Sequence, residues 1–148
     1  MQRMNQKEAV TIVGVELRTN NTQAAQSIPD FWKKFYDENL LAQLTDKESV
    51  DLYAVYTNYE DAGYSSEGQY SLIIGVTSDE LTKDSEGLVQ AVLPQQEYMV
   101  FSVSDNKVEN VDKTWQAILK NRIIERTFDV DYECYRSNGY IDVVVGVR

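Results

Sequence analysis

Apolar and polar positions follow the same order twice along this chain, which predicts two β-α-β-β units. In the first half, residues 8–18 are rich in valine and isoleucine and predict a strand. A helical spacing of apolar residues around Trp32 comes next. Apolar runs at residues 51–57 and 70–77 then predict two strands that suit an antiparallel hairpin.

The second half gives the same sequence of elements. A short strand is expected over residues 88–93 and a longer one over residues 98–103. A helix that carries Trp115 follows, and residues 128–135 and 141–147 predict the closing pair of strands. Each unit leaves one apolar face that it cannot bury alone, so the two units should pack together.

Both predicted helices have start signals. Ser27 lies three residues before Asp30, with Pro29 between them, which predicts a helix start close to a capping box. Asn110 is expected to cap the second helix. The first helix should present an apolar, mostly aromatic face formed by Ile28, Phe31, Trp32, Phe35 and Tyr36. The second should present an apolar stripe formed by Val111, Trp115, Ile118, Leu119 and Ile123.

The matched helix tryptophans and the matched strand ends at Gly75 and Gly146 favour a true duplication. Two similar but unrelated hairpin units are the alternative. The chain is expected to form one domain over residues 1–148, with one module over about residues 8–78 and the other over about 88–148. The seam between the modules is the place to expect a ligand.

Charge and composition limit the classes of function. Asp and Glu number 24 against 14 Lys and Arg, which gives a net charge of −10. Such a surface repels phosphate backbones, so direct nucleic-acid binding is not expected. The single cysteine, Cys134, excludes an intramolecular disulfide and suits a reducing compartment. Without a long apolar run or a signal-peptide core, we expect a cytoplasmic protein that does not contact membranes.

The chain contains no histidine, which excludes every catalytic or metal site that needs an imidazole. Its seven glycines are scattered, so no phosphate-binding loop is present. We expect no cofactor and no metal site. Any chemistry must rest on carboxylates, tyrosines and tryptophans.

The strand over residues 128–135 alternates in character along its length. Its apolar face, expected to lie under the helices, consists of Phe128, Val130, Tyr132 and Cys134. Its other face consists of Asp129, Asp131, Glu133 and Tyr135. That second face is either open to solvent or lines the cleft between the modules. In a cleft walled by aromatic rings, a carboxylate such as Glu133 would attract a cation.

Aromatic residues offer walls for such a cleft. Ten tyrosines are many for this length, and eight of them fall in two clusters, at residues 53–70 and 132–140. Any one of them is explained by ordinary sheet packing, whereas the set beside Glu133 suggests flat apolar walls with hydroxyl tips. Trp32 and Trp115 are either ligand contacts or anchors between helix and sheet.

Several segments together resemble a known family. They are IPDFW at residues 28–32, LYAVYTNYE at 52–60, DYECY at 131–135 and IDVVV at 141–145. In this order they resemble the GyrI-like, or AraC-type effector-binding, superfamily over nearly the whole chain. RTNN at residues 18–21 is similar to the stand-alone members from integron cassettes.

The resemblance implies an α+β fold of two β-α-β-β modules related by pseudo-two-fold symmetry. An antiparallel sheet would carry two main helices on one side and a ligand cleft between the modules. The ligands of the family are amphipathic, often cationic, drug-like molecules, and Glu133 matches the strand glutamate that meets the positive charge. The resemblance also suggests ligand-binding roles for Tyr56, Tyr135 and Trp115, with Trp32 and Tyr53 as further candidates.

Three functions compete at this point. The preferred one is a stand-alone binder of amphipathic cationic compounds. We expect no DNA-binding domain ahead of the effector-binding unit, so transcription control would need a separate regulatory partner. A hydrolase with Glu133 as general base and tyrosine partners is the enzymatic alternative. A gyrase-inhibitor-like protein is the third. Binding is preferred to catalysis because one carboxylate in an aromatic cleft serves binding equally well; a monomer or a homodimer fits each function.

Overall fold

One sheet and two helices form the framework of the computed structural model, which describes residues 1–148. The strands are β1 (Gln2–Gln6), β2 (Val10–Asn20), β3 (Leu52–Thr57), β4 (Gln69–Thr77), β5 (Val89–Leu93), β6 (Gln96–Ser102), β7 (Arg126–Tyr135) and β8 (Ile141–Val147). The helices are α1 (Ala24–Asp37) and α2 (Val111–Lys120). Neither helix is long and apolar enough to cross a lipid bilayer.

The eight strands pair antiparallel in the order β1-β6-β8-β7-β3-β4-β2-β5. Read inward from either end, the two halves of the sheet have equivalent strands, β1-β6-β8-β7 and β5-β2-β4-β3. The halves meet where β3 pairs with β7, with Ala54 opposite Glu133 and Tyr56 opposite Asp131. The repeat in the sequence is thus a repeat in topology, and the seam is a continuous pair of strands.

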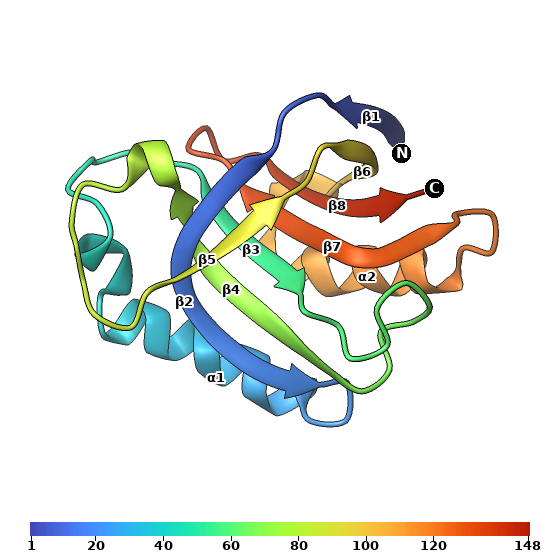
Figure 1. Ribbon diagram of the computed structural model, residues 1–148, viewed down its shortest axis with the longest axis horizontal. Helices are drawn as coiled ribbons and strands as arrows, with labels where there is room; N and C mark the ends of the chain where they lie inside the picture. The colour runs from blue at the N-terminus through green and yellow to red at the C-terminus, as the bar shows by residue number, and fades with distance from the viewer.

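Both helices pack on the same side of the sheet, which confirms the predicted α+β arrangement (Figure 1). The core beneath α1 is formed by Phe35, Leu52, Ala54, Leu72 and Ile74. The core beneath α2 is formed by Val103, Val111, Ile118, Ile141, Val143, Val145 and Val147. Each half therefore packs its own helix against its own strands, and the seam between the halves lies between the helices.

The opposite face of the sheet is buried as well, because the sheet curls around a third core (Figure 1). That core consists of Ile12, Val55, Ile73, Ala91, Leu93, Tyr98, Val130, Tyr132, Cys134 and Val144. Burial on both faces explains why β4 and β8 are continuous apolar runs instead of alternating ones.

The curl corrects one expectation for β7. Val130, Tyr132 and Cys134 belong to the core on the face away from the helices, and they do not lie under them. Phe128 does not share their face by simple alternation, because it has a φ of +48° within an irregular stretch of β7. The face with Glu133 is the one that the helices flank.

Both helix starts differ from the predictions. Helix α1 begins at Ala24, so Ser27 lies inside it and its hydroxyl bonds the Thr19 hydroxyl at 2.6 Å instead of capping the helix. Pro29 is therefore the sixth helical residue, at the cost of one backbone hydrogen bond. At the start of α2, the Asn110 side chain bonds the Ser104 carbonyl and makes no cap.

Two further features of the chain were not predicted. Strand β1 has one apolar residue, Met4, so it lacks the alternation of apolar and polar residues that predicts a strand. It forms because it pairs antiparallel with the edge of β6. Ile123 lies beyond the end of α2 and is 88% exposed, so the apolar stripe of that helix is shorter than its sequence pattern.

Gly14 and Gly75 allow β2 and β4 to approach closely. They are direct partners in the ladder, and a Cβ on Gly14 would lie 2.0 Å from the Ile74 carbonyl oxygen. A Cβ on Gly75 would lie equally close to the Val13 carbonyl oxygen. Both obstacles are backbone atoms, so neither can move without displacing a strand.

Gly14→Ala is therefore expected to lower the free energy of unfolding by about 1–3 kcal/mol, the range for overpacking a well-packed interior. Urea unfolding would measure the change, with Gln90→Ala on the exposed side of the neighbouring strand as the control. A Gly14→Ala protein as stable as its Gln90→Ala counterpart would contradict the close approach.

Candidate functional site

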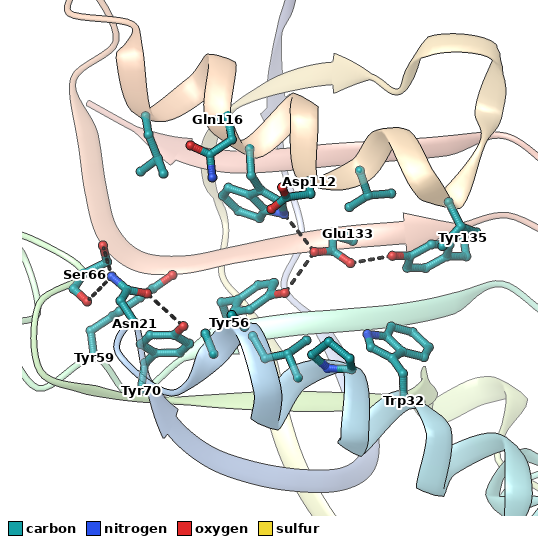
Figure 2. Close-up of a pocket in the computed structure, with 18 of the residues that line it drawn as sticks. Asn21, Trp32, Tyr56, Tyr59, Ser66, Tyr70, Asp112, Gln116, Glu133 and Tyr135 are labelled. Atoms are coloured by element: carbon teal, nitrogen blue, oxygen red, sulfur yellow. Dashed lines mark hydrogen bonds between the residues drawn. The ribbon is translucent and has the colours of Figure 1, made fainter.

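A cleft of about 770 Å³ lies between α1 and α2, over the central strands β3 and β7 (Figure 2). Twelve of its 19 lining residues are hydrophobic. Helix α1 lines it with Ile28, Pro29 and Trp32, while α2 lines it with residues that include Trp115. The sheet supplies the side chains between the helices, among them Glu133. The seam expected from the repeat is thus a real cavity.

Glu133 lies at the centre of this cleft, and its side chain is the most unusual feature of the site. Only 3% of the residue is exposed, and no basic group pairs with it. The hydroxyl of Tyr56 and the indole N–H of Trp115 donate to its Oε2 at 2.9 and 2.8 Å. The hydroxyl of Tyr135 donates to its Oε1 at 2.5 Å. Three neutral donors thus hold a buried carboxylate.

Burial and hydrogen bonding act in opposite directions on this carboxyl. Burial raises the pKa of Glu133, and the hydrogen bonds from Tyr135, Trp115 and Tyr56 lower it in part. The balance is a raised pKa, because hydrogen bonds from neutral groups do not cancel the charge. Burial and the neighbouring carboxylate likewise raise the pKa values of Tyr56 and Tyr135, which keeps both hydroxyls protonated as donors.

The structure brings five of the six predicted site residues to the cleft. Tyr56, Trp115 and Tyr135 contact Glu133 directly. Trp32 lies edge-on to Tyr135, with ring centroids 5.4 Å apart, and lines the cleft without contacting the carboxylate by a hydrogen bond. Both tryptophans are therefore wall residues of the cavity in addition to packing on the sheet.

Tyr53 is the exception, and its assignment to the site is corrected. It is offset by one residue from Ala54, which faces α1, so it points to the other face of the sheet. There its ring packs against Tyr132, with centroids 5.9 Å apart. Burial raises its pKa, as expected for a tyrosine in the third core.

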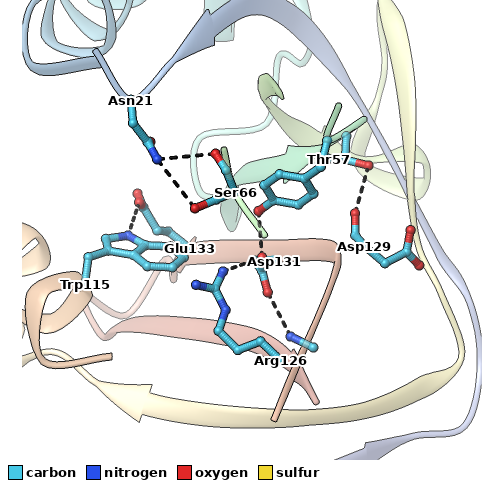
Figure 3. Close-up of polar contacts among 10 residues, drawn as sticks. Asn21, Thr57, Ser66, Trp115, Arg126, Asp129, Asp131 and Glu133 are labelled. Carbon is cyan, nitrogen blue, oxygen red and sulfur yellow. Dashed lines mark hydrogen bonds and ion pairs between the residues drawn. The ribbon is translucent and has the colours of Figure 1, made fainter. Parts of the chain in front are cut away.

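A second buried carboxylate lies beside the site and was not predicted to be part of it. Asp131 is fully buried and accepts hydrogen bonds from Tyr59 at 2.6 Å, from Arg126 at 2.8 Å and from the backbone N–H of Gly146 at 2.9 Å (Figure 3). In contrast to Glu133, this carboxylate has a basic partner. The sequence indicates that Asp131 lies near the site, because it precedes Glu133 by two residues on the same strand and so shares its face. It does not indicate the pairing with Arg126, because β7 is irregular between Arg126 and Asp131 and simple alternation fails there.

Polar residues close one end of the cleft. Asn21, in the turn after β2, bonds Ser66 in the loop between β3 and β4, and Tyr70 donates to the Asn21 side-chain oxygen at 2.9 Å. All three line the cavity. Both segments were predicted only as loops, and nothing in their sequence indicates that they meet.

A family model described as "integron-associated effector binding protein", Cass2, matches residues 3–147. The chain belongs to this family. The match covers nearly the whole sequence, so the resemblance to effector-binding proteins of integron cassettes is confirmed.

Solved structures show the same fold at low sequence identity. An integron cassette protein of Vibrio cholerae, VCH_CASS2, superposes with a TM-score of 0.78 at 24% identity, over 99% of this chain and 95% of that one. A putative bacterial transcription regulation protein of Staphylococcus aureus gives 0.72 at 20% identity, over 99% and 95%. SAV2435, in a structure bound to tetraphenylphosphonium, gives 0.72 at 20% identity, over 100% and 94%. No curated protein matches the sequence.

The raised pKa of Glu133 has a consequence for stability. A carboxyl whose pKa is higher in the folded than in the unfolded chain stabilises the fold at acid pH, and this contribution is lost as the pH rises through the raised value. Glutamine can accept the two bonds made to Oε2 and donate to the Tyr135 oxygen, without a charge. Glu133→Gln should therefore be more stable than the natural protein at neutral pH.

Thermal unfolding at several pH values tests this expectation. The melting temperature of Glu133→Gln should exceed that of the natural protein at neutral pH, by about 2–4 °C for each kcal/mol, and the difference should vanish at acid pH. Glu86→Gln, an exposed position far from the cleft in sequence, removes the same charge and serves as the control. A destabilised Glu133→Gln at every pH would contradict the argument.

Proposed function

We propose that this protein is an effector-binding protein that holds an amphipathic cationic small molecule in the cleft between its two halves, with Glu133 opposite the positive charge. One observation carries the proposal: Glu133 is buried at the centre of an aromatic cleft, held by three neutral donors, and has no basic partner.

The charge of the site favours a cation over other ligands. A buried carboxylate without a counter-charge is unfavourable, and the raised pKa of Glu133 expresses that cost. A cationic ligand supplies the missing charge, whereas an anion would add to the repulsion. The three hydrogen bonds leave the carboxylate fixed in position, so it need not rearrange when a cation approaches.

The walls of the site favour a ligand with flat apolar groups. Trp32, Tyr56 and Trp115 line the cleft together with aliphatic side chains from both helices. Aromatic faces attract cations, by roughly 0.5–2 kcal/mol for each ring, and they also bury apolar surface. A lipophilic cation with delocalised charge gains from both effects. Tetraphenylphosphonium, the molecule named with SAV2435, has these properties and is a suitable probe.

Titration with tetraphenylphosphonium should change the tryptophan fluorescence, because both tryptophans of the chain line the cleft. Glu133→Gln should weaken the binding by about 1–3 kcal/mol, the scale of a charge-assisted contact, as measured by isothermal titration calorimetry. Glu86→Gln should leave the affinity unchanged.

Two ligands of similar shape separate charge from hydrophobicity. Tetraphenylborate carries the opposite charge and should not bind, and neutral triphenylphosphine, which has no oxygen acceptor, should bind weakly. The proposal fails if no phosphonium binds below about millimolar concentration, or if the neutral and cationic compounds bind equally well.

A further inference from the structure

The two ends of the cleft differ in chemistry. On one side of Glu133, Trp32 and Tyr135 form an aromatic wall, whereas Asn21 and Ser66 lie on the other side (Figure 2). Arg126 also lines the cleft, and it is drawn near Trp115 and Asp131 (Figure 3). An ideal ligand of this cleft is therefore not symmetric about its charge.

Arg126 has hydrogen-bonding capacity that the protein does not use. Its side chain is 8% exposed, and one terminal nitrogen donates to Asp131 at 2.8 Å. Its Nε–H is buried without a partner, and the guanidinium makes no other hydrogen bond. The guanidinium instead faces the rings of Phe128 and Trp115, at 4.4 and 5.8 Å from their centroids. A guanidinium can donate five hydrogen bonds, so most of its donors are free.

The charges around Arg126 determine which group would use those donors. Asp131 neutralises the guanidinium, and Tyr59 and the Gly146 backbone complete the hydrogen bonds of that carboxylate. The ion pair therefore has no net charge, and Glu133 remains the one uncompensated carboxylate of the buried centre. A neutral oxygen acceptor gains the guanidinium hydrogen bond, whereas an anionic group would add a charge that nothing nearby offsets.

We propose that Arg126 is a specificity-determining residue that donates to a neutral oxygen acceptor, such as an amide carbonyl, on the same ligand whose cation lies against Glu133. This inference rests on the function proposed above. Trp115 lies between Glu133 and Arg126. Its indole N–H donates to the Glu133 carboxylate, while its ring lies against the Arg126 guanidinium. The ligand class is thus a lipophilic cation joined by a short chain to a carbonyl group.

Matched phosphonium ligands test this inference. One series carries an alkyl chain on triphenylphosphonium that ends in a primary amide, at several chain lengths, and the control series ends in an isopropyl group of the same size in its place. If affinity depended only on the transfer of apolar surface out of water, the alkyl-terminated ligands would bind more tightly than the amides. If Arg126 recognises the carbonyl, the amide of one chain length should bind about tenfold more tightly than its alkyl control, as measured by calorimetry.

Arg126→Lys keeps the ion pair with Asp131 but has no planar edge of donors, so it should abolish the preference for the amide while both ligands still bind. If Arg126→Lys does not fold, Arg126→Met combined with Asp131→Asn removes the ion pair and every side-chain donor at position 126, without leaving a buried charge. That double variant should likewise lose the preference for the amide.

The inference is overturned if the alkyl ligands bind as tightly as the amides at every chain length, or if the preference survives in the variant that folds. In both cases binding that still depends on Glu133 would leave the proposed function intact. Failure of every phosphonium to bind would instead refute the proposed function itself.

Discussion

The burial of Glu133 without a basic partner is the constraint on which the rest of the site depends. Two helices flank the face of β7 that carries this residue, and only 3% of the residue is exposed, so the carboxylate is almost fully shielded from water. Three neutral donors fix it in place, and the nearest buried carboxylate, Asp131, has the arginine. The protein thus keeps one charge paired and a neighbouring charge unpaired, two residues apart on the same strand. In the proposed function, the unpaired charge is the group that meets the ligand.

The duplication explains how such a site arises. Tyr56 pairs with Leu72, three residues before Gly75, and Glu133 pairs with Val143, three residues before Gly146. Equating the two glycines makes Tyr56 the counterpart of Glu133. The two halves thus contribute a donor and an acceptor from equivalent positions, and these meet in a 2.9 Å hydrogen bond across the seam. The repeated backbone forms the cavity. The difference between Tyr56 and Glu133 at equivalent positions gives the cavity its negative charge.

Much of this structure could be predicted from the sequence, because the patterns are local. The helices around Trp32 and Trp115, and the strands of the repeat, follow from periodicity, and alternation along β7 placed Glu133 and Tyr135 on one face. The features that were missed depend on distant partners. Strand β1 has no apolar pattern of its own and forms by pairing with β6.

The errors at the site have the same cause. Alternation along β3 puts Tyr53 and Tyr56 on opposite faces of the sheet, so only one of them can line the cleft. Which one does depends on the face that the helices cover, and Tyr53 lies in the core on the other face. Arg126 reaches Asp131 because β7 is irregular near Phe128. The positive φ of Phe128 could not be predicted from the pattern of apolar and polar residues. The polar end of the cleft joins two loops that are 45 residues apart. Such contacts follow from the fold, and sequence periodicity carries no information about them.

Carboxyl-carbon NMR can follow the pKa of Glu133 in the free protein and with saturating tetraphenylphosphonium, and so tests whether the buried carboxylate lacks a counter-charge until a cation binds. The pKa should lie above the ordinary glutamate range in the free protein and should decrease markedly when the cation binds, because the ligand then supplies the missing charge. An ordinary pKa in the free protein, or a raised one that the bound cation leaves unchanged, would contradict this expectation.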